Sequence, residues 1–169
     1  EISILPLRGT VLYPDLILPI MVGRKKSVKL IDDSMDSDRI IGVITQKRSE
    51  IEDPKESDLY SVGVAALILR MIRELDGSQR VIVQGISRIK VKEYSQKEPY
   101  YKVRCETVDE SYVPGVEVDA LMMNLKNLFQ RAVELAPYLT AELGTMVSNI
   151  KSAAILAVLI ASNLNIATT

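Results

Sequence analysis

The residues that interrupt regular secondary structure are distributed unevenly along this 169-residue chain. Most glycines and prolines precede Val113-Pro114-Gly115, whereas only Pro137 and Gly144 follow it. Short strands and turns are expected where such residues are frequent, and long helices where they are rare. The distribution predicts an α+β chain with a β-rich domain over residues 1–112 and an all-helical subdomain over residues 113–169.

The first part begins with short runs of strand character. Residues 2–5 and 11–13 are rich in β-formers. Because proline removes a backbone donor, we expect these strands to be broken by the prolines that follow, which are Pro6, Pro14 and Pro19.

One short helix and one buried strand follow. Residues 25–35 carry apolar side chains at helical spacing, which predicts a helix with a single buried stripe made of Val28, Ile31 and Met35. Residues 39–45 form a nearly continuous apolar run, as in a strand covered on both faces. Residues 49–58 are acidic and predict a solvated, mobile loop.

The clearest local signal is Asp76-Gly77 between two β-rich runs, which predicts a hairpin because glycine adopts a positive φ without strain. Residues 87–92 and 101–106 alternate strictly, and the second run places Cys105 in phase with Val103. These strands predict a meandering, partly closed barrel.

Three helices are predicted after residue 115. The first should run for about five turns, end before Pro137 and bury one stripe, made of Val118, Leu121, Met122, Leu125, Leu128, Phe129 and Ala132. The second should bury Leu139, Leu143, Met146, Val147 and Ile150. The third, over residues 153–163, is apolar nearly all round, so it needs cover on most sides, either within a bundle or from chain beyond residue 169.

The composition excludes several kinds of catalysis. With no histidine and one cysteine, the chain cannot build a Ser-His-Asp triad, a His-ligated metal site or a Cys-rich zinc site. No glycine precedes a lysine, which excludes a Walker A loop. The pairs Asp32-Asp33 and Glu52-Asp53 are interpreted as solvated charges, and Cys105 as a small core residue. We therefore expect no catalytic, cofactor or metal site.

Charge and hydropathy also limit the partners. The formal net charge of −1 gives no global attraction to nucleic acid or anionic lipid. The longest apolar run, residues 153–161, is far shorter than the roughly 20 residues of a membrane-spanning helix. A single cysteine and no secretory leader favour a soluble, intracellular protein.

Two surface features can carry binding. The basic residues Arg24, Lys25, Lys26 and Lys29 follow an apolar, proline-broken segment over residues 12–21. This arrangement is either a solvated helix face beside core strands or an apolar contact surface rimmed by cations. The second feature is a row of three cations, Arg88, Lys90 and Lys92. It is either a soluble strand face or a set of phosphate contacts for RNA.

The β-rich part resembles the amino-terminal region of the Lon ATP-dependent proteases. The most specific block is the segment Leu5-Pro6-Leu7-Arg8-Gly9-Thr10-Val11-Leu12-Tyr13-Pro14. Further similarities follow in the same order, at Leu18-Pro19, Val22-Gly23-Arg24, Lys26-Ser27, residues 43–47, Asp58-Leu59-Tyr60, Val62-Gly63, Leu75-Asp76-Gly77, residues 81–85 and Arg88. The helical part matches the family more loosely.

The resemblance implies a PUA-like β pseudo-barrel of the Lon amino-terminal type, followed by a helical bundle that is truncated at its carboxyl end. It also implies a cytoplasmic homohexamer that degrades misfolded, damaged and short-lived regulatory proteins as part of quality control and the stress response. In the full-length protein an AAA+ ATPase, with ATP and Mg, and a Ser-Lys serine protease do the chemistry. Motifs of both modules are missing here.

For this region the resemblance implies recognition of misfolded or degron-bearing polypeptides and support of hexamer assembly. We expect the contacts to come from the first surface feature, through Leu12, Tyr13, Leu16, Met21, Arg24, Lys25, Lys26 and Lys29. Adaptable apolar contacts suit a receptor for many sequences. Two alternatives remain, an RNA-binding PUA-type module and a purely structural oligomerisation module that uses the third helix.

Overall fold

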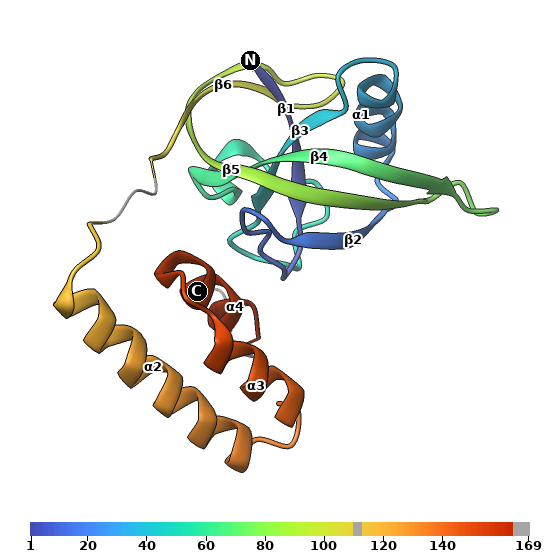
Figure 1. Ribbon diagram of the computed structural model, residues 1–169. Helices are drawn as coiled ribbons and strands as arrows, with labels where there is room; N and C mark the ends of the chain where they lie inside the picture. The colour runs from blue at the N-terminus through green and yellow to red at the C-terminus, as the bar shows by residue number, and fades with distance from the viewer. Residues whose placement is uncertain (110–112, 164–169) are drawn as a thin grey trace. The chain divides into compact units, whose positions relative to one another are not determined.

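The computed structural model describes residues 1–109 and 113–163, and these fall into two compact units. The first unit ends at Asp109, and the second contains the three carboxyl-terminal helices (Figure 1). Residues 110–112 at the predicted domain boundary and residues 164–169 at the predicted truncated end lie outside the described residues.

The first unit is built on one six-stranded sheet. In sequence order its strands are β1 (Ile2–Leu7), β2 (Ile17–Val22), β3 (Ile40–Thr45), β4 (Val62–Arg73), β5 (Gln79–Gln96) and β6 (Lys102–Thr107). The sheet order is β2-β5-β4-β3-β1-β6, and β6 also pairs with β5. Five strands therefore form a closed ring of pairings, while β2 pairs only with β5 among the strands of the described residues.

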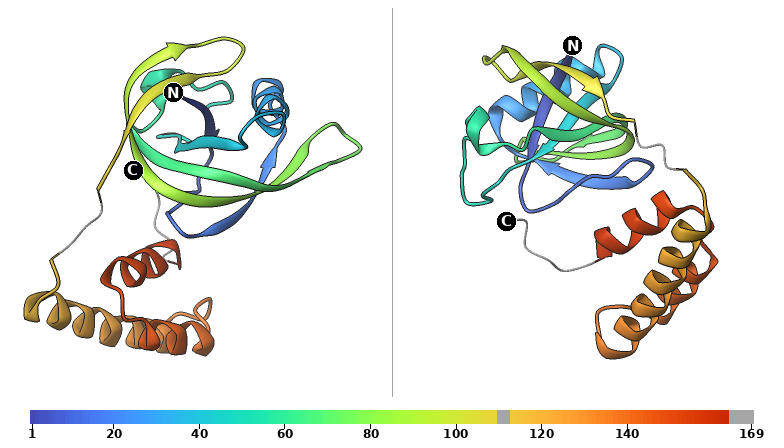
Figure 2. Two further views of the ribbon diagram at one scale, coloured as in Figure 1. Left: turned by 45° about the horizontal axis from the view of Figure 1, so that its top comes forward. Right: turned by 90° about the vertical axis from the view of Figure 1, so that its left-hand side faces the viewer.

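The long strands curve because the β4–β5 pairing changes register at two points and the β5–β6 pairing at two more. Figure 2 shows the resulting bend, with helix α1 (Lys25–Met35) packed inside the curve of the sheet. The predicted hairpin is confirmed, with Gly77 at a φ of +84° in the turn between β4 and β5.

The core of this unit lies on both faces of β1 and β3. Leu5 and Leu7 of β1 belong to a cluster that also includes Leu30 and Ile31 of α1. Ile4 faces the opposite way and joins a second cluster with members that include Ile44, Ile89 and Val103. The expectation that residues 39–45 form a strand covered on both faces is confirmed for β3.

The strand predictions near the amino terminus were partly wrong. Residues 11–13 are not a strand, whereas β1 continues through Pro6 and β2 contains Pro19. Both prolines are tolerated because their nitrogen atoms point to the side of the strand where no neighbouring strand pairs at that residue. No backbone hydrogen bond is therefore lost. In α1 the fully buried positions are Leu30 and Ile31, whereas Val28 and Met35 are only partly buried.

The acidic segment 49–58 is more ordered than predicted. Its last residues form a short 3-10 helix, Glu56–Asp58, and Pro54 within it is buried. The hydroxyl of Tyr101 donates a hydrogen bond to the Pro54 carbonyl oxygen over 3.0 Å. Gln46 also donates to the Ile51 carbonyl over 2.9 Å, so the segment is anchored at several of its backbone carbonyl groups, while most of its charged side chains stay exposed.

The second unit contains α2 (Val116–Leu135), α3 (Ala141–Asn149) and α4 (Ala153–Asn163). Their buried cluster is Phe129, Leu139, Val147, Leu156 and Ile160. Thr140 begins α3 by accepting the Leu143 N–H, and the bond from Gln130 Nε2 to the Gly144 carbonyl, 2.7 Å long, joins α2 to α3.

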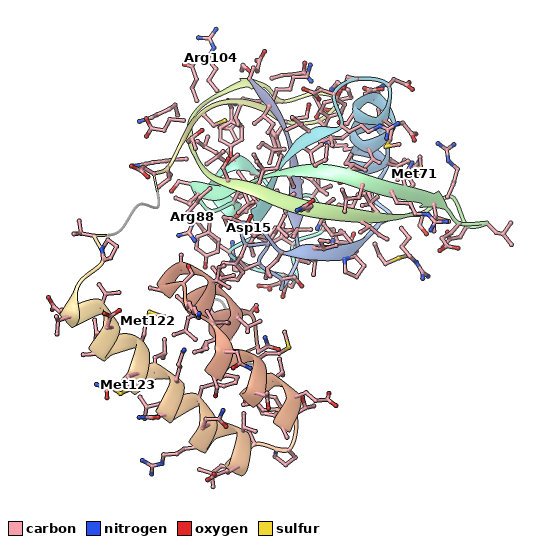
Figure 3. All side chains as sticks on the ribbon, viewed as in Figure 1. Asp15, Met71, Arg88, Arg104, Met122 and Met123 are labelled. Carbon is pink, nitrogen blue, oxygen red and sulfur yellow. The ribbon has the colours of Figure 1, made fainter. Side chains whose placement is uncertain are left out.

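The predicted stripe on α2 was too wide. Leu121 and Leu128 are exposed, as is Met146 on α3, because the partners of α2 cover only the side that carries Phe129. Figure 3 labels Met122 and Met123 on α2; Met122 packs on the buried cluster and Met123 is exposed. No helix within the described residues combines the length and the hydropathy needed to cross a bilayer.

Candidate functional site

An exposed apolar surface lies on the outer side of β2 and its neighbours. Side chains alternate along a strand, and Leu18, Ile20 and Val22 are directed inward on β2. The intervening side chains face out, with 60% of Ile17 and 59% of Met21 exposed.

The strand register extends this surface across three strands. Met21 lies opposite Arg80 of β5, which lies opposite Ile72 of β4. The next row joins Pro19, Ile82 and Arg70 in the same way. We call this surface the outer face, and it consists of Ile17, Pro19, Met21, Arg70, Ile72, Arg80 and Ile82.

The segment before β2 is held in place by backbone bonds to β5. Asp15 donates its N–H to the carbonyl of Gly85 over 3.1 Å, and Gly85 donates to the carbonyl of Leu16 over 2.9 Å. Of the predicted contact residues here, Leu12 is 4% exposed and belongs to the core, whereas Tyr13 and Leu16 are half-buried. Leu12 is buried because it packs in the cluster between the sheet and α1, so it is not part of an exposed surface.

The predicted basic cluster is divided among different partners. Arg24 turns inward and donates to Oε1 of the buried Gln46 and to the Ile51 carbonyl. Lys26 pairs with Glu98 at 3.0 Å and Asp53 at 3.4 Å, and the Glu98 contact raises the pKa of Lys26.

The remaining two lysines lie on the exposed side of α1. Lys29 pairs with Asp33 at 3.3 Å, one helical turn away, and Lys25 is exposed. Ion pairs of this kind at the surface contribute little to stability because water screens them.

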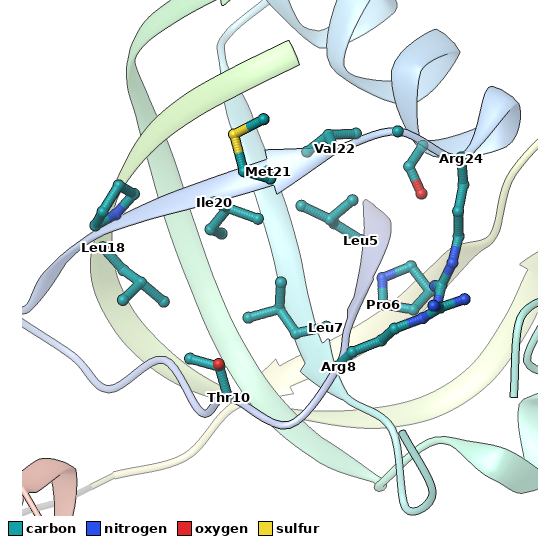
Figure 4. Close-up of a pocket in the computed structure, with 13 residues that line it drawn as sticks. Leu5, Pro6, Leu7, Arg8, Thr10, Leu18, Ile20, Met21, Val22 and Arg24 are labelled. Atoms are coloured by element: carbon teal, nitrogen blue, oxygen red, sulfur yellow. The ribbon is translucent and has the colours of Figure 1, made fainter. Parts of the chain in front are cut away.

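A groove of about 410 Å³ lies between β1 and β2 (Figure 4). Its apolar wall includes Leu5, Leu7 and Ile20, and its lining also includes Arg8 and Arg24. Figure 4 shows the guanidinium groups of these two arginines meeting at one end of the groove. Burial lowers the pKa of Arg24, and the nearby charge of Arg8 lowers that pKa further.

Of the carboxylates interpreted as solvated charges, Asp33, Glu52 and Asp53 are exposed and Asp32 is half-buried, and the pair Asp32-Asp33 also has hydrogen-bond partners. Asp32 accepts hydrogen bonds from Arg73 and from the buried Gln79, both over 2.7 Å. Asp33 accepts from the hydroxyl of Tyr100 over 2.8 Å, and this bond lowers the pKa of Asp33. The described residues contain no cluster of potential metal ligands, and Cys105 is a free, half-buried thiol.

The second basic row is partly neutralised. Lys92 pairs with Glu106 at 2.6 Å on the neighbouring strand, and Arg104 pairs with Glu93 at 2.8 Å across the same two strands. Lys90 is exposed on the same segment. Alternating charges of opposite sign on a strand pair provide a weaker field for phosphates than a row of cations.

Sequence reasoning missed Arg8, Ile17 and the members of the outer face on β4 and β5. The alternation of Ile17, Pro19 and Met21 with inward residues is a usable signal for β2. It was obscured because prolines were expected to end strands. The pairing of β2 with β5 depends on contacts distant in sequence, and no local pattern indicates them.

The sequence matches over residues 1–169 the family described as the ATP-dependent protease La (LON) substrate-binding domain. Similar proteins include the Lon protease of Dictyoglomus thermophilum, 40% identical over 98% of this chain, and that of Anaeromyxobacter dehalogenans, 43% identical over 98%. The aligned residues are 21% and 20% of those relatives, so the chain spans about a fifth of their length.

Solved structures have the same fold. The N terminal domain of Mycobacterium avium complex Lon protease superimposes with a TM-score of 0.64 at 20% identity, covering 96% of this chain and 97% of that one. A Lon N-terminal domain protein from Xanthomonas campestris gives a TM-score of 0.54 at 16% identity, covering 94% and 96%. With the match to the family along its whole length, the chain belongs to the LON substrate-binding domains.

Proposed function

We propose that this chain recognises non-native polypeptides for a Lon protease, through the outer face of its first unit. The observation that carries this proposal is the exposure of Ile17 and Met21 beside Ile72 on one continuous three-strand surface. Large exposed apolar patches are rare on soluble proteins and mark sites where a partner binds. An unfolded chain offers the apolar segments that could cover this surface.

The chemistry of the outer face suits many sequences rather than one. Met21 is flexible and polarisable, so it adapts to side chains of different shape. Arg70 and Arg80 lie among the apolar residues and keep the uncovered surface hydrated. Of the residues predicted from sequence, we keep Tyr13, Leu16 and Met21 as candidate contacts, with Lys25 as a cation at the nearby start of α1.

For the whole protein we propose the activity of its relatives. The chain spans about a fifth of proteins named Lon protease, so an ATPase module that uses ATP and Mg and a Ser-Lys peptidase would lie in the rest. We further propose a cytoplasmic homohexamer that degrades misfolded, damaged and short-lived proteins. Within it the present chain would deliver polypeptides and support assembly without catalysis of its own.

We also propose that the domain boundary lies near residues 112–113 and that the first unit is a PUA-like pseudo-barrel. The ring of pairings from β5 through β4, β3, β1 and β6 supports this fold type. An RNA-binding role has less support because Glu93 and Glu106 lie among the cations that would contact phosphates.

The test is binding of the 169-residue chain to a reduced, alkylated, permanently unfolded protein, measured by fluorescence anisotropy. Ile17→Glu and Met21→Glu should each weaken binding about tenfold, because each places a charge within the apolar contact. Leu128→Glu is the matched control, since Leu128 is also 60% exposed but lies on α2. Equal binding by the wild type and the two β2 variants, with folding intact, would refute the assignment of this surface.

A further inference from the structure

The strand β2 has an edge with unpaired backbone groups. The N–H of Gly85 reaches the carbonyl of Leu16, so the backbone of Leu16 is directed toward β5. In an antiparallel pair, the backbone N–H and C=O groups of successive residues point to opposite edges of the strand. The backbone groups of Leu18, Ile20 and Val22 are therefore also directed toward β5. The polar backbone groups of Ile17, Pro19 and Met21 therefore point to the other edge, which pairs with no strand within the described residues.

This edge borders the groove between β1 and β2. The groove lining includes Leu18 to Val22 on one side and Leu5 to Arg8 on the other. A strand edge beside an apolar groove is the arrangement that binds an extended peptide by strand addition, because the edge supplies main-chain hydrogen bonds and the groove takes alternate side chains. Pro19 removes one donor from this edge, but its carbonyl and the groups of Ile17 and Met21 remain.

The end of the groove carries positive charge that the fold does not fully neutralise. Arg8 donates to the carbonyl oxygen of Glu52, and Arg24 donates to Gln46 and to the Ile51 carbonyl, so both bond to neutral oxygens. The carboxylates that face Arg24 come from the acidic segment, and they are Glu52 and Asp53. Asp53 is paired with Lys26 at 3.4 Å.

The arginines at the end of the groove also border a second cavity. Pro6, Arg8, Gly23, Arg24 and Ser27 also line a second cavity of about 410 Å³, which continues to the start of α1 and to Tyr101. A bound chain could therefore pass the arginines rather than stop at them. Because open space lies beside the arginines in both cavities, a side chain within a polypeptide is favoured over a terminal carboxylate as the group that the arginines meet.

We propose that an extended segment of a substrate polypeptide adds as a strand to the free edge of β2 and places an aspartate or glutamate side chain against Arg8 and Arg24. Apolar side chains on alternate positions of the segment would fill the groove beside Leu7 and Ile20. The preferred sequence is then an apolar stretch of alternating pattern with one acidic residue. This inference rests on the proposed function and specifies how the substrate is recognised.

The experiment uses the 169-residue chain and three labelled ten-residue peptides of alternating valine and serine. The first has one central glutamate, the second has glutamine there, and the third keeps the glutamate but has two prolines that remove backbone donors. Hydrogen bonds to a charged group are stronger than those to a neutral group. The glutamate peptide should therefore bind the wild type about tenfold more tightly than the glutamine peptide. The proline peptide should bind at least about fivefold more weakly, because strand addition needs those donors.

Arg8→Gln and Arg24→Gln should each reduce the preference for glutamate to about twofold or less, since a neutral amide loses the charge assistance. Arg104→Gln is the control and should retain the preference, because Arg104 lies on β6, paired with Glu93, and is not in the groove lining. Arg8 is exposed, so its variant keeps the test valid if Arg24→Gln does not fold.

The outcomes separate this inference from the function on which it rests. If the chain binds the unfolded protein but treats all three peptides alike, or binds none of them, the groove assignment is overturned and the proposed function stands. If the chain binds no unfolded protein either, the proposed function itself fails. Self-association of β2 edges would appear as concentration-dependent sedimentation that the peptides do not reverse, and it would also overturn the inference.

Discussion

Gly85 donates its backbone N–H to the carbonyl of Leu16 over 2.9 Å, and this bond fixes the approach of the preceding segment to the sheet. The approach is close: a Cβ atom on Gly85 would lie 2.2 Å from the carbonyl oxygen of Tyr13. Tyr13 and Leu16, two of the candidate contacts, can therefore lie where they do only because residue 85 of β5 is a glycine.

Gly85→Ala should destabilise the first unit by about 1–3 kcal/mol, because backbone atoms must shift to admit the methyl group. Gly23→Ala is the matched control, since a Cβ atom there would meet nothing within 4 Å. It should change stability by no more than about 0.5 kcal/mol. Urea unfolding followed by circular dichroism measures both, and equal stability of the two variants would contradict the close approach.

Asp32 should be important for the connection between α1 and the β4–β5 hairpin. Gln79 is completely buried, and its amide nitrogen donates to Asp32 over 2.7 Å. Asp32→Ala would leave that buried donor without its acceptor, at an expected cost of about 1–3 kcal/mol. Asp36→Ala, at the exposed end of α1, should cost about 0.5 kcal/mol or less in the same unfolding experiment.

The bond from Tyr100 to Asp33 should make stability depend on acid pH. Tyr100 donates to the carboxylate and lowers its pKa in the folded state. A lowered folded-state pKa means that the stabilisation is present above the unfolded pKa of about 4 and is lost as the pH falls through the folded value. In thermal unfolding from pH 7 to pH 3, the wild type should lose more of its Tm than Tyr100→Phe. Parallel curves for the two proteins would contradict this linkage.

The helical unit offers a test of which side of α2 is buried. Phe129 is 3% exposed, and Phe129→Ala should destabilise this unit by about 3–5 kcal/mol through lost burial and the cavity left behind. Its neighbour Leu128 is 60% exposed, so Leu128→Ala should cost about 0.5 kcal/mol or less. Comparable losses of unfolding free energy in the two variants would show that Leu128 is also buried, as the helical periodicity predicts.

Local signals predicted much of the fold. The helix expected over residues 25–35 is α1, the Asp76-Gly77 pair forms the hairpin turn, and the apolar run over residues 153–163 is α4. Each of these depends on interactions between residues near in sequence, such as helical spacing or the conformational freedom of glycine. Sequence patterns report such interactions directly.

The candidate site was less predictable because it depends on pairing between distant segments. Nothing near Ile17 indicates that β5 will lie beside it, so the strand was missed and its prolines were taken as breaks. The basic residues are adjacent in sequence, but only the folded chain shows that Arg24 turns toward Arg8 and Gln46 while Lys26 turns toward Glu98. The orientation of each side chain is set by its hydrogen-bond and ion-pair partners, which are distant in sequence.

The measurement that tests the central claim most directly is hydrogen–deuterium exchange of the chain with and without a saturating unfolded polypeptide. Substrate recognition through β2 predicts slower exchange at the backbone amides of Ile17 and Met21, with no comparable change along α2. Protection confined to the helices, or no protection of residues 17–22 at full occupancy, would contradict it.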